Sequence, residues 1–387
     1  MKLRRLSSPT MRWLLAAAAI LLPAWSALAG DCKVWPAWDA FRDRYVEEGG
    51  RVVDRATERQ QTTSEGQSYA LFFALVANDR PAFERILRWT EENLAGGDLT
   101  GRLPAWQWGR RDDGTWGILD DNAAADADLW IAYALAEAGR LWKLQKYAAL
   151  GELLADRILR EESDDIPGLG RTLLPGPKGF HNEKDVWQLN PSYVPLQLVQ
   201  RMAALYPKSA WRNLVPAAVD LLVRSAPRGL APEWVYYKAD EGFRPDPATQ
   251  GEGSFNAIRV YLWVGMLAAD EPMRPELVQR LAPMARYVLG HGTPPAKADT
   301  RAGSGEGVAP VGFSAALLPF LAAANLPEAM NQQLLRVIAK GTPARDDNYY
   351  DQVLTLYGLG WSDGQFKFAR NGALVPRWTC TPSSSSP

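Results

Sequence analysis

The feature that most limits the fold of this chain is a helical spacing of apolar residues that recurs in twelve segments. Apolar residues three and four positions apart fall on one face of an α-helix, whereas a half-buried strand alternates at every second residue. No convincing series of alternating strands is present, so the chain is predicted to be all-α. The twelve segments are 38–46, 64–76, 81–94, 123–141, 146–160, 191–205, 211–224, 254–267, 275–289, 311–321, 327–339 and 349–359.

The helical segments are of two kinds. Segments 69–77 and 123–135 are apolar on nearly every side, which is typical of a helix buried on most faces. Segments 81–94 and 146–160 carry charged residues on one side only. This alternation of inner and outer helices predicts helical hairpins arranged as a closed ring, and six hairpins of roughly sixty residues match the chain length. No repeat is visible in the sequence itself.

The segments between the helices give the remaining organisation. A short hairpin is predicted from 365–368 and 374–375, across the Arg-Asn-Gly turn at 370–372. Loops rich in Trp, Gly and Pro are expected to carry the functional site, because long loops on a rigid scaffold usually do. They cover 103–116, 167–188 and 231–253. No linker marks a boundary, so 30–380 is predicted to be a single domain.

The first 29 residues have the pattern of an export signal. Four basic residues between positions 2 and 12 precede an apolar run at 13–22, and Ala27-Leu28-Ala29 supplies a cleavage pattern. The alternative is an uncleaved anchor, although the apolar run is short for a membrane span. The mature chain is therefore predicted to be periplasmic or secreted, with no stable membrane insertion after cleavage.

Cys32 and Cys380 are the only cysteines and lie near the two ends of the mature chain. In an oxidising compartment they could form a disulfide that joins these ends, or remain as two unpaired thiols. The serine-rich tail at 381–387 is predicted to be disordered.

Composition excludes several classes of function. Lys and Arg total 43 against 44 Asp and Glu, so clustered positive charge for nucleic acid is not expected. Two His and two Cys leave too few ligands for a transition-metal site, and no cofactor motif is present. The chain also has 16 Trp, 13 Tyr and 11 Phe, whose flat faces suit sparsely charged ligands such as sugars. Carboxylate chemistry among aromatic side chains remains.

Glu65 is the first candidate carboxylate, in the sequence Thr-Thr-Ser-Glu-Gly-Gln-Ser-Tyr at 62–69. It can form a capping box with Thr62 at the start of a helix. Alternatively, it lies at the mouth of an inner helix and donates a proton to a leaving oxygen. Both interpretations fit the sequence.

Asp126 is the second candidate, on an otherwise apolar helix. A buried Asp is costly unless partners or a ligand satisfy it, and Trp130 and Tyr133 share its face of the helix. Asp128 points to another side. The alternative is that Asp126 lies in a first turn and interacts with the helix dipole.

Several stretches of the sequence resemble glycoside hydrolase family 8, and in particular the members encoded beside bacterial cellulose synthases. The resemblance covers essentially the whole mature chain, in order. It implies an (α/α)6 barrel with an open cleft and endo-hydrolysis of β-1,4-glucan with inversion. The stretches are TTSEGQSY at 62–69, LPAWQW at 103–108, ADADLWIAYALAEAGRLW at 125–142, NPSY at 190–193, AIRVYLWVGM at 257–266 and GFSAA at 312–316.

By this resemblance, Glu65 matches the general acid and Asp126 the aspartate beside the reacting sugar. Inversion also requires a base roughly 6.5–9.5 Å from the acid, with a water between them. Close relatives have a Tyr-Asp pair before Ala-Ile-Arg, and that Asp is taken as the base. This chain has Phe255-Asn256 there, followed by Arg259. The stretch 256–259 is therefore expected to mark the water side.

A neutral amide at Asn256 cannot accept a proton as a carboxylate does, which leaves three explanations. The first is that activity is weak. The second is that a neighbouring acid, Glu252, Asp246 or Glu241, supplies the base. The third is that Asp126 acts through a water.

Glucose rings are expected to stack on aromatic side chains of the loops, and cellulose or cello-oligosaccharides are the expected partners. The cellulose synthase complex is a further possible partner. A glucan-binding protein that has lost turnover through Asn256 is the alternative function, and a polysaccharide lyase is a third. The expected stacking residues are Trp106, Trp108, Trp116, Trp187, Tyr193 and Trp234.

Overall fold

The computed structural model describes residues 35–379, except residue 182 and residues 341–347. The proposed signal peptide at 1–29, both cysteines and the tail at 381–387 lie outside the described residues. The twelve predicted helices are all confirmed within them. They are α1 (Pro36–Tyr45), α2 (Ser64–Val76), α3 (Arg80–Leu94), α4 (Ala125–Trp142), α5 (Gln145–Glu161), α6 (Leu196–Leu205), α7 (Trp211–Arg224), α8 (Ala257–Gly265), α9 (Arg274–His291), α10 (Val311–Ala323), α11 (Pro327–Lys340) and α12 (Tyr349–Ser362).

Two of these helices begin three or more residues later than predicted. Pro191–Tyr193 forms a separate 3-10 turn, η1, and α6 starts only after Pro195. Pro195 has no N–H to donate, and it restricts the backbone of the residue before it. Helix α8 begins at Ala257 rather than at residue 254, because the preceding residues run through a short strand and a turn.

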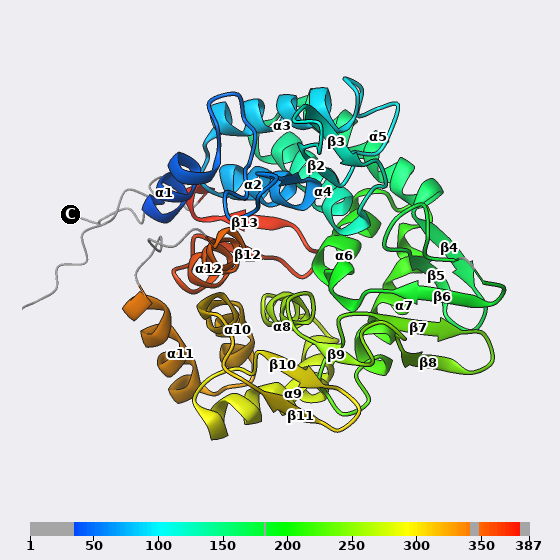
Figure 1. Cartoon of the computed structure of the whole chain (residues 1–387), viewed down its shortest axis with the longest axis vertical. Helices are drawn as coiled ribbons and strands as arrows, with labels where there is room; N and C mark the ends of the chain where they lie inside the picture. Colours follow the sequence, from blue (N-terminus) through cyan, green and yellow to red (C-terminus); the bar gives the residue numbers. More distant parts are fainter. Residues whose placement is uncertain (1–34, 182, 341–347, 380–387) are drawn as a thin grey trace, which may run out of the picture.

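The helices form the predicted ring of inner and outer members. Figure 1 shows α2, α4, α6, α8, α10 and α12 around the centre, with α3, α5, α7, α9 and α11 outside them. In α10 every residue from Gly312 to Leu321 is buried, whereas α3 buries only one face. This is the architecture of an (α/α)6 barrel, as expected.

The loops contain more strand than the sequence predicted. The only strands expected were those of the terminal hairpin, and the structure adds several short ones. These strands have two to five residues, too short for an alternating pattern to stand out. They form four small sheets: β1 (Thr62–Thr63), β2 (Gln107–Arg110) and β3 (Trp116–Asp120); β4 (Ser163–Ile166) and β5 (Gly170–Leu173); β6 (Val186–Leu189), β7 (Val235–Lys238) and β8 (Gly242–Pro245); and β9 (Glu252–Gly253), β10 (Lys297–Asp299) and β11 (Ser304–Glu306).

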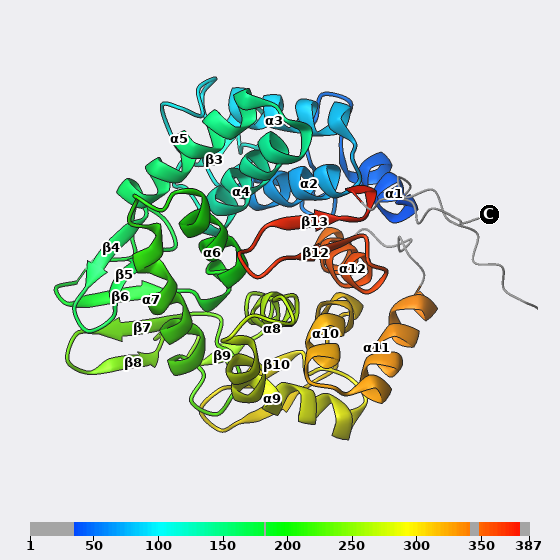
Figure 2. The same cartoon turned by 180° about the vertical axis from the view of Figure 1, so that it is seen from behind.

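The terminal hairpin is confirmed and lies inside the ring. Strands β12 (Phe366–Phe368) and β13 (Leu374–Pro376) run between α2 and α12 in both views (Figures 1 and 2). The Tyr133 hydroxyl donates to the Gly372 carbonyl at 2.8 Å, and the Leu374 N–H donates to Glu137 at 2.8 Å. These contacts reach the C-terminal part of α4. The hairpin therefore packs beside the middle and C-terminal part of α4 and leaves the first turn of that helix for other groups.

The centre of the ring is packed with aromatic side chains from the inner helices. Tyr69 of α2 contacts Trp130 of α4 with ring centroids 5.9 Å apart, and Tyr357 of α12 at 5.3 Å. Trp130 lies 5.3 Å from Trp263 of α8. All four rings are buried. This cluster fixes the spacing of the inner helices just below their N-terminal ends. No helix among the described residues is both long and apolar enough to cross a bilayer.

Candidate active site

The N-terminal ends of four inner elements bring the candidate residues together. Glu65 lies in the first turn of α2 and Asp126 in the first turn of α4. Ser192 belongs to η1, directly before α6, and Arg259 lies in the first turn of α8. Residues up to 194 positions apart thus meet at one end of the barrel.

Arg259 is the centre of this cluster and is only 2% exposed. Its Nη1 donates to the Glu65 carboxylate, to Asp126 Oδ2 at 2.9 Å and to the Tyr69 hydroxyl at 2.7 Å. A buried guanidinium needs such partners, and the two carboxylates hold its pKa well above the ordinary value against the effect of burial. The side chains of Glu65 and Asp126 therefore lie in one charged cluster around Arg259.

The other terminal nitrogen of Arg259 faces a different set of groups. Its Nη2 donates to Asn256 Oδ1 at 2.6 Å and to Ser192 Oγ at 3.1 Å. The guanidinium thus separates a carboxylate side, at Nη1, from an amide side, at Nη2. Asn256 thus lies on the amide side of Arg259, whereas Arg259 itself also contacts the candidate acid Glu65.

Glu65 does not form the capping box with Thr62 that the sequence allowed as an alternative. Thr63 caps α2 by accepting the Gly66 N–H at 3.0 Å, whereas Thr62 donates its hydroxyl to the Val52 carbonyl at 2.6 Å. The Glu65 side chain is 24% exposed, which is far more than its partner Arg259. It is therefore the carboxyl of this cluster that solvent or a substrate can reach.

Asp126 is buried beside Glu65 and also accepts the Ala127 N–H at 2.8 Å. Burial, with a further contribution from Glu65, raises the pKa of Asp126 to about 7, although Arg259 opposes the shift. Two carboxyls thus share one cation, and the site holds a proton near neutrality. Because both bind the same nitrogen, their bonded oxygens lie within two hydrogen-bond lengths, about 6 Å.

Asn256 lies between Arg259 and a carboxylate that sequence reasoning missed. Its Nδ2 donates to Glu233 Oε2 at 2.6 Å. Glu233 also accepts the backbone N–H groups of Ser254 at 2.5 Å, of Asn256 at 2.9 Å and of Ala257 at 3.2 Å. Glu233 is 23 residues before Asn256 and carries no motif, so only the tertiary structure reveals the contact.

The acids considered as neighbouring bases are each engaged elsewhere. Glu252 lies in strand β9 rather than one helical turn before Asn256, and it pairs with Lys297 at 2.9 Å. Asp246 accepts from Gln188 at 2.7 Å and caps its own turn. Glu241 pairs with Lys238 and Arg244 on the surface. Each of these carboxylates is thus bonded to groups other than Asn256, and the hypothesis that one of them supplies the base stays a prediction.

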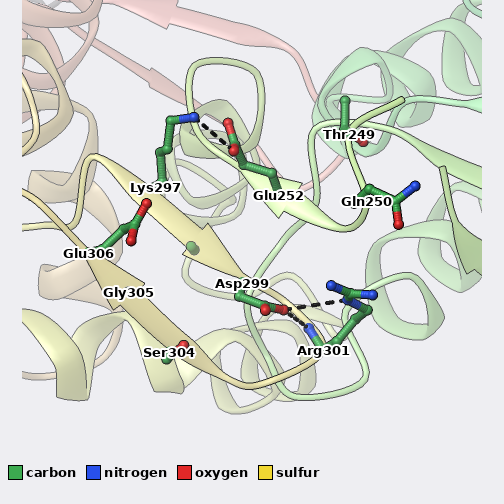
Figure 3. A pocket seen from close by; sticks show the side chains of 10 residues that line it. Thr249, Gln250, Glu252, Lys297, Asp299, Arg301, Ser304, Gly305 and Glu306 are labelled. Atoms are coloured by element: carbon green, nitrogen blue, oxygen red, sulfur yellow. Dashed lines mark hydrogen bonds and ion pairs between the residues drawn. The ribbon is translucent and has the colours of Figure 1, made fainter. Parts of the chain in front are cut away.

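Figure 3 shows Glu252 and Lys297 joined across a hollow of about 380 Å³ on the sheet of β9, β10 and β11. A second ion pair there joins Asp299 and Arg301. The hollow is lined by polar and charged groups without an aromatic ring, and none of its lining residues belongs to the Arg259 cluster. It is not the site described here.

Three of the predicted stacking residues lie on or next to the sheet of β1, β2 and β3, which leads into α2. The Trp106 carbonyl accepts the Ser64 N–H at 2.9 Å, which ties the start of α2 to the β2 segment. Trp108 and Trp116 lie on β2 and β3 and stack with centroids 5.4 Å apart. Trp116 is 44% exposed. It thus offers a flat surface close to the first turn of α2.

A second aromatic group lies on the Ser192 side. Tyr193 is 5.8 Å from Trp234, and Trp234 stacks on Phe180 at 5.9 Å with the ring planes 6° apart. Arg259 lies over the Tyr193 ring at 5.6 Å. The sequence analysis did not single out Phe180, because an isolated Phe in a glycine-rich loop gives no periodic signal.

Trp187 does not fit a sugar-stacking role. It is only 3% exposed, its ring stacks on His181 at 4.3 Å, and its Nε1 donates to Asp164 at 2.9 Å. Both its faces and its polar edge are taken up by the fold. The prediction failed because β6 places this residue on the inner face of its sheet.

Phe255 is the exposed aromatic residue next to Asn256, with 51% exposure. Phe313 meets its ring edge-on at 5.3 Å, and the Tyr350 hydroxyl donates to the Phe255 carbonyl at 2.6 Å. A third aromatic surface therefore lies on the amide side of Arg259.

Carboxyl groups among aromatic side chains, at one end of a barrel of helical hairpins, are the arrangement expected of a glycoside hydrolase. The chain belongs to the glycosyl hydrolases of family 8, whose model matches residues 11–364. It is 46% identical over 375 residues to an endoglucanase of Xanthomonas axonopodis pv. citri, covering 96% of this chain and 97% of that protein. It is 45% identical over 359 residues to an endoglucanase of Salmonella typhi, covering 93% and 95%.

A solved structure gives the same result for the fold. The endo-1,4-D-glucanase from Vibrio fischeri ES114 superposes with a TM-score of 0.83 at 45% identity, covering 90% of this chain and all of that one. The helical ring is therefore the architecture of this family.

Proposed function

We propose that this glycoside hydrolase is an endo-β-1,4-glucanase that cleaves internal bonds of cellulose chains with inversion. The observation that carries the proposal is the sharing of Arg259 Nη1 by Glu65 and Asp126. Relatives at 45–46% identity over more than nine tenths of the chain are endoglucanases. The substrate class follows from these relatives and from the uncharged aromatic surfaces beside the site.

Glu65 is the general acid in this proposal. It is the exposed carboxyl of the pair, so it is the one that a glycosidic oxygen can reach. Glu65 gives its proton to the glycosidic oxygen as the bond to C1 breaks. Asp126, held by Arg259 and the Ala127 N–H, stays beside the reacting sugar and stabilises its developing positive charge.

The water that attacks C1 comes from the amide side of Arg259. Inversion requires the base roughly 6.5–9.5 Å from the acid, and the bonded oxygens of Glu65 and Asp126 are too close for that pair. Asn256 and Ser192, both on Nη2, mark the place of the water. Trp106, Trp108 and Trp116 on one side, and Tyr193 and Trp234 on the other, bind glucose rings of the extended chain.

Loss of turnover is the competing function, and one observation favours it. Asn256 is an amide and offers no carboxylate to the water. Its Nδ2 donates to Glu233 and its Oδ1 accepts from Arg259. A glucan-binding protein would use the same aromatic surfaces without releasing product.

The proposal also covers where in the cell the protein acts. Residues 1–29 direct the chain out of the cytoplasm, and the processed protein works in the periplasm or outside the cell. There it trims glucan near a cellulose synthase complex. The support is the signal-like sequence and the resemblance to members encoded beside cellulose synthases.

The test is hydrolysis of carboxymethyl-cellulose by wild type, Glu65→Gln and Glu328→Gln. The last replaces an exposed glutamate on α11 and controls for loss of charge. We expect Glu65→Gln to release no reducing sugar while it is still retarded in gels that contain the polymer. Unchanged turnover of Glu65→Gln would contradict the assignment, and retardation of wild type without product would favour the binding protein.

A further inference from the structure

On the amide side of Arg259, two hydrogen bonds connect three side chains in series. Arg259 Nη2 donates to Asn256 Oδ1 at 2.6 Å, and Asn256 Nδ2 donates to Glu233 Oε2 at 2.6 Å. A guanidinium can only donate and a carboxylate can only accept, so the orientation of the carboxamide between them is fixed. Asn256 thus connects the site to a carboxylate that does not touch Arg259.

Glu233 is held rigidly in this position. Its Oε1 accepts the backbone N–H groups of Ser254 and Ala257, and its own N–H donates to the Glu252 carbonyl at 2.7 Å. These bonds fasten the carboxylate to the strand and turn that lead into α8. Oε2 faces the amide of Asn256, whose side chain and backbone N–H both donate to it.

Asn256 and Glu233 are chemically matched. An aspartate at position 256 would place two carboxylates where the present distance is 2.6 Å, and two such groups cannot both ionise. The amide removes that repulsion. The neutral residue at position 256 and the carboxylate at position 233 therefore form one unit.

From this geometry we infer that Glu233 is the terminal proton acceptor on the water side and that Asn256 relays the proton to it. The inference rests on the proposed glucanase function. As the water oxygen bonds to C1, its proton passes to Asn256 Oδ1 while an Nδ2 proton passes to Glu233 Oε2. Asn256 becomes the imidic acid and Glu233 becomes neutral, and Glu65 gives its proton to the leaving oxygen. Reverse transfer from Glu233 to the nitrogen, with loss of the Oδ1 proton to solvent, restores the amide, and Glu65 regains a proton from solvent.

Two features of the site favour this relay. Donation by Arg259 to Oδ1 polarises the amide and makes the Nδ2 protons more acidic, while the second lone pair of Oδ1 stays available to a water. Asp126 lies on the other nitrogen of Arg259, beside the acid, and Glu252 is paired with Lys297. Glu233 is thus the carboxylate that the described residues connect to the water side.

The relay predicts that Glu233→Gln changes kcat in opposite directions in the native chain and in a chain that carries Asn256→Asp. Glu233→Gln in the native chain is expected to lower kcat by about 10²–10³-fold with little change in KM, as loss of a positioned base does. In a chain that already carries Asn256→Asp, the same Glu233→Gln is expected to raise kcat. The carboxylate introduced at position 256 then accepts the proton directly, and the amide introduced at position 233 donates to it. Glu328→Gln, which alters an exposed glutamate on α11, is the control and should keep wild-type kcat.

If Glu233→Gln folds poorly, Asn256→Ala is a second variant that tests the same relay. It leaves Glu233 on its backbone N–H groups and removes the amide between Glu233 and Arg259 Nη2, so kcat should fall at least as far as in Glu233→Gln. The double variant should fall no further, since the two residues act as one unit.

The inference is overturned if Glu233→Gln lowers kcat and the melting temperature alike in both backgrounds, which would make Glu233 a cap of α8 only. It is also overturned if Glu233→Gln keeps kcat within about twofold. The proposed function would survive either result as long as Glu65→Gln abolishes hydrolysis. Wild-type turnover in Glu65→Gln would instead remove the proposed function itself.

Discussion

Asp128 of the inner helix α4 lies beside Glu162 at the end of the outer helix α5, and both are completely buried. Their carboxyl oxygens have no other hydrogen-bond partner among the described residues. Burial is the main cause that raises the pKa of both groups well above their ordinary values, and each also interacts with the other. Both carboxyls are therefore expected to retain their protons to higher pH than in the unfolded chain, and they lie outside the proposed mechanism.

This pair predicts that the folded protein loses stability as the pH rises. The unfolded chain releases these protons near the ordinary pKa values of 3.8 and 4.5, whereas the folded chain retains them to higher pH. The contribution to stability is thus complete below about pH 4 and is lost as the pH rises through the folded-state pKa values. Glu162→Gln supplies a permanent N–H donor to Asp128 and should flatten the dependence.

The measurement is the free energy of unfolding in denaturant between about pH 5 and pH 9, for wild type, Glu162→Gln and the surface control Glu328→Gln. The control should follow wild type. An equally steep slope in Glu162→Gln would show that another group carries the pH dependence.

Arg259→Lys tests the central cation. A lysine keeps the positive charge but cannot bind groups on two separate nitrogens, so it cannot hold both Asp126 and Asn256 in place. We expect kcat on carboxymethyl-cellulose to fall by about 10²-fold or more, the size of a lost oriented donor. Circular dichroism should show an unchanged helical content. Full activity in Arg259→Lys would mean that charge alone is sufficient.

Trp116→Ala and Trp187→Ala are expected to differ in kind. Trp116 is exposed, so its removal should weaken glucan binding by about tenfold, close to 1.4 kcal/mol, with little loss of stability. Trp187 is buried, so its removal should cost about 3–5 kcal/mol of unfolding free energy. Affinity electrophoresis and thermal melting separate the two effects. Weaker binding in Trp187→Ala at a temperature where it remains folded would restore its predicted stacking role.

Gly372→Ala tests how the terminal hairpin is seated. Gly372 has φ of 73°, and a Cβ there would overlap the Gln197 carbonyl of α6. Gly364 has a similar φ of 70° but open space around its Cβ position. Gly364→Ala should therefore cost only the backbone strain, about 1 kcal/mol. Gly372→Ala should cost at least about 3 kcal/mol. Equal melting temperatures would show that the hairpin can shift without loss.

Much of the barrel could be predicted, because each helix records its environment in its own sequence. The all-round apolar character of 123–135 and the two-faced pattern of 81–94 correctly separated inner from outer helices. The short strands could not be predicted in this way. Two to five residues contain too few alternations, and their pairing joins segments such as 186–189 and 235–238.

The sequence by itself determined which elements form, and it marked Glu65, Asp126 and Arg259 through motifs that lie within single helices. Only the tertiary structure decided which side chains meet: Glu233 with Asn256, Asp128 with Glu162, and Trp187 with His181. Periodicity arises from contacts between a helix and its own surroundings, so it is written locally. A hydrogen bond between side chains 23 residues apart depends on how the ring closes, and no local pattern encodes that closure.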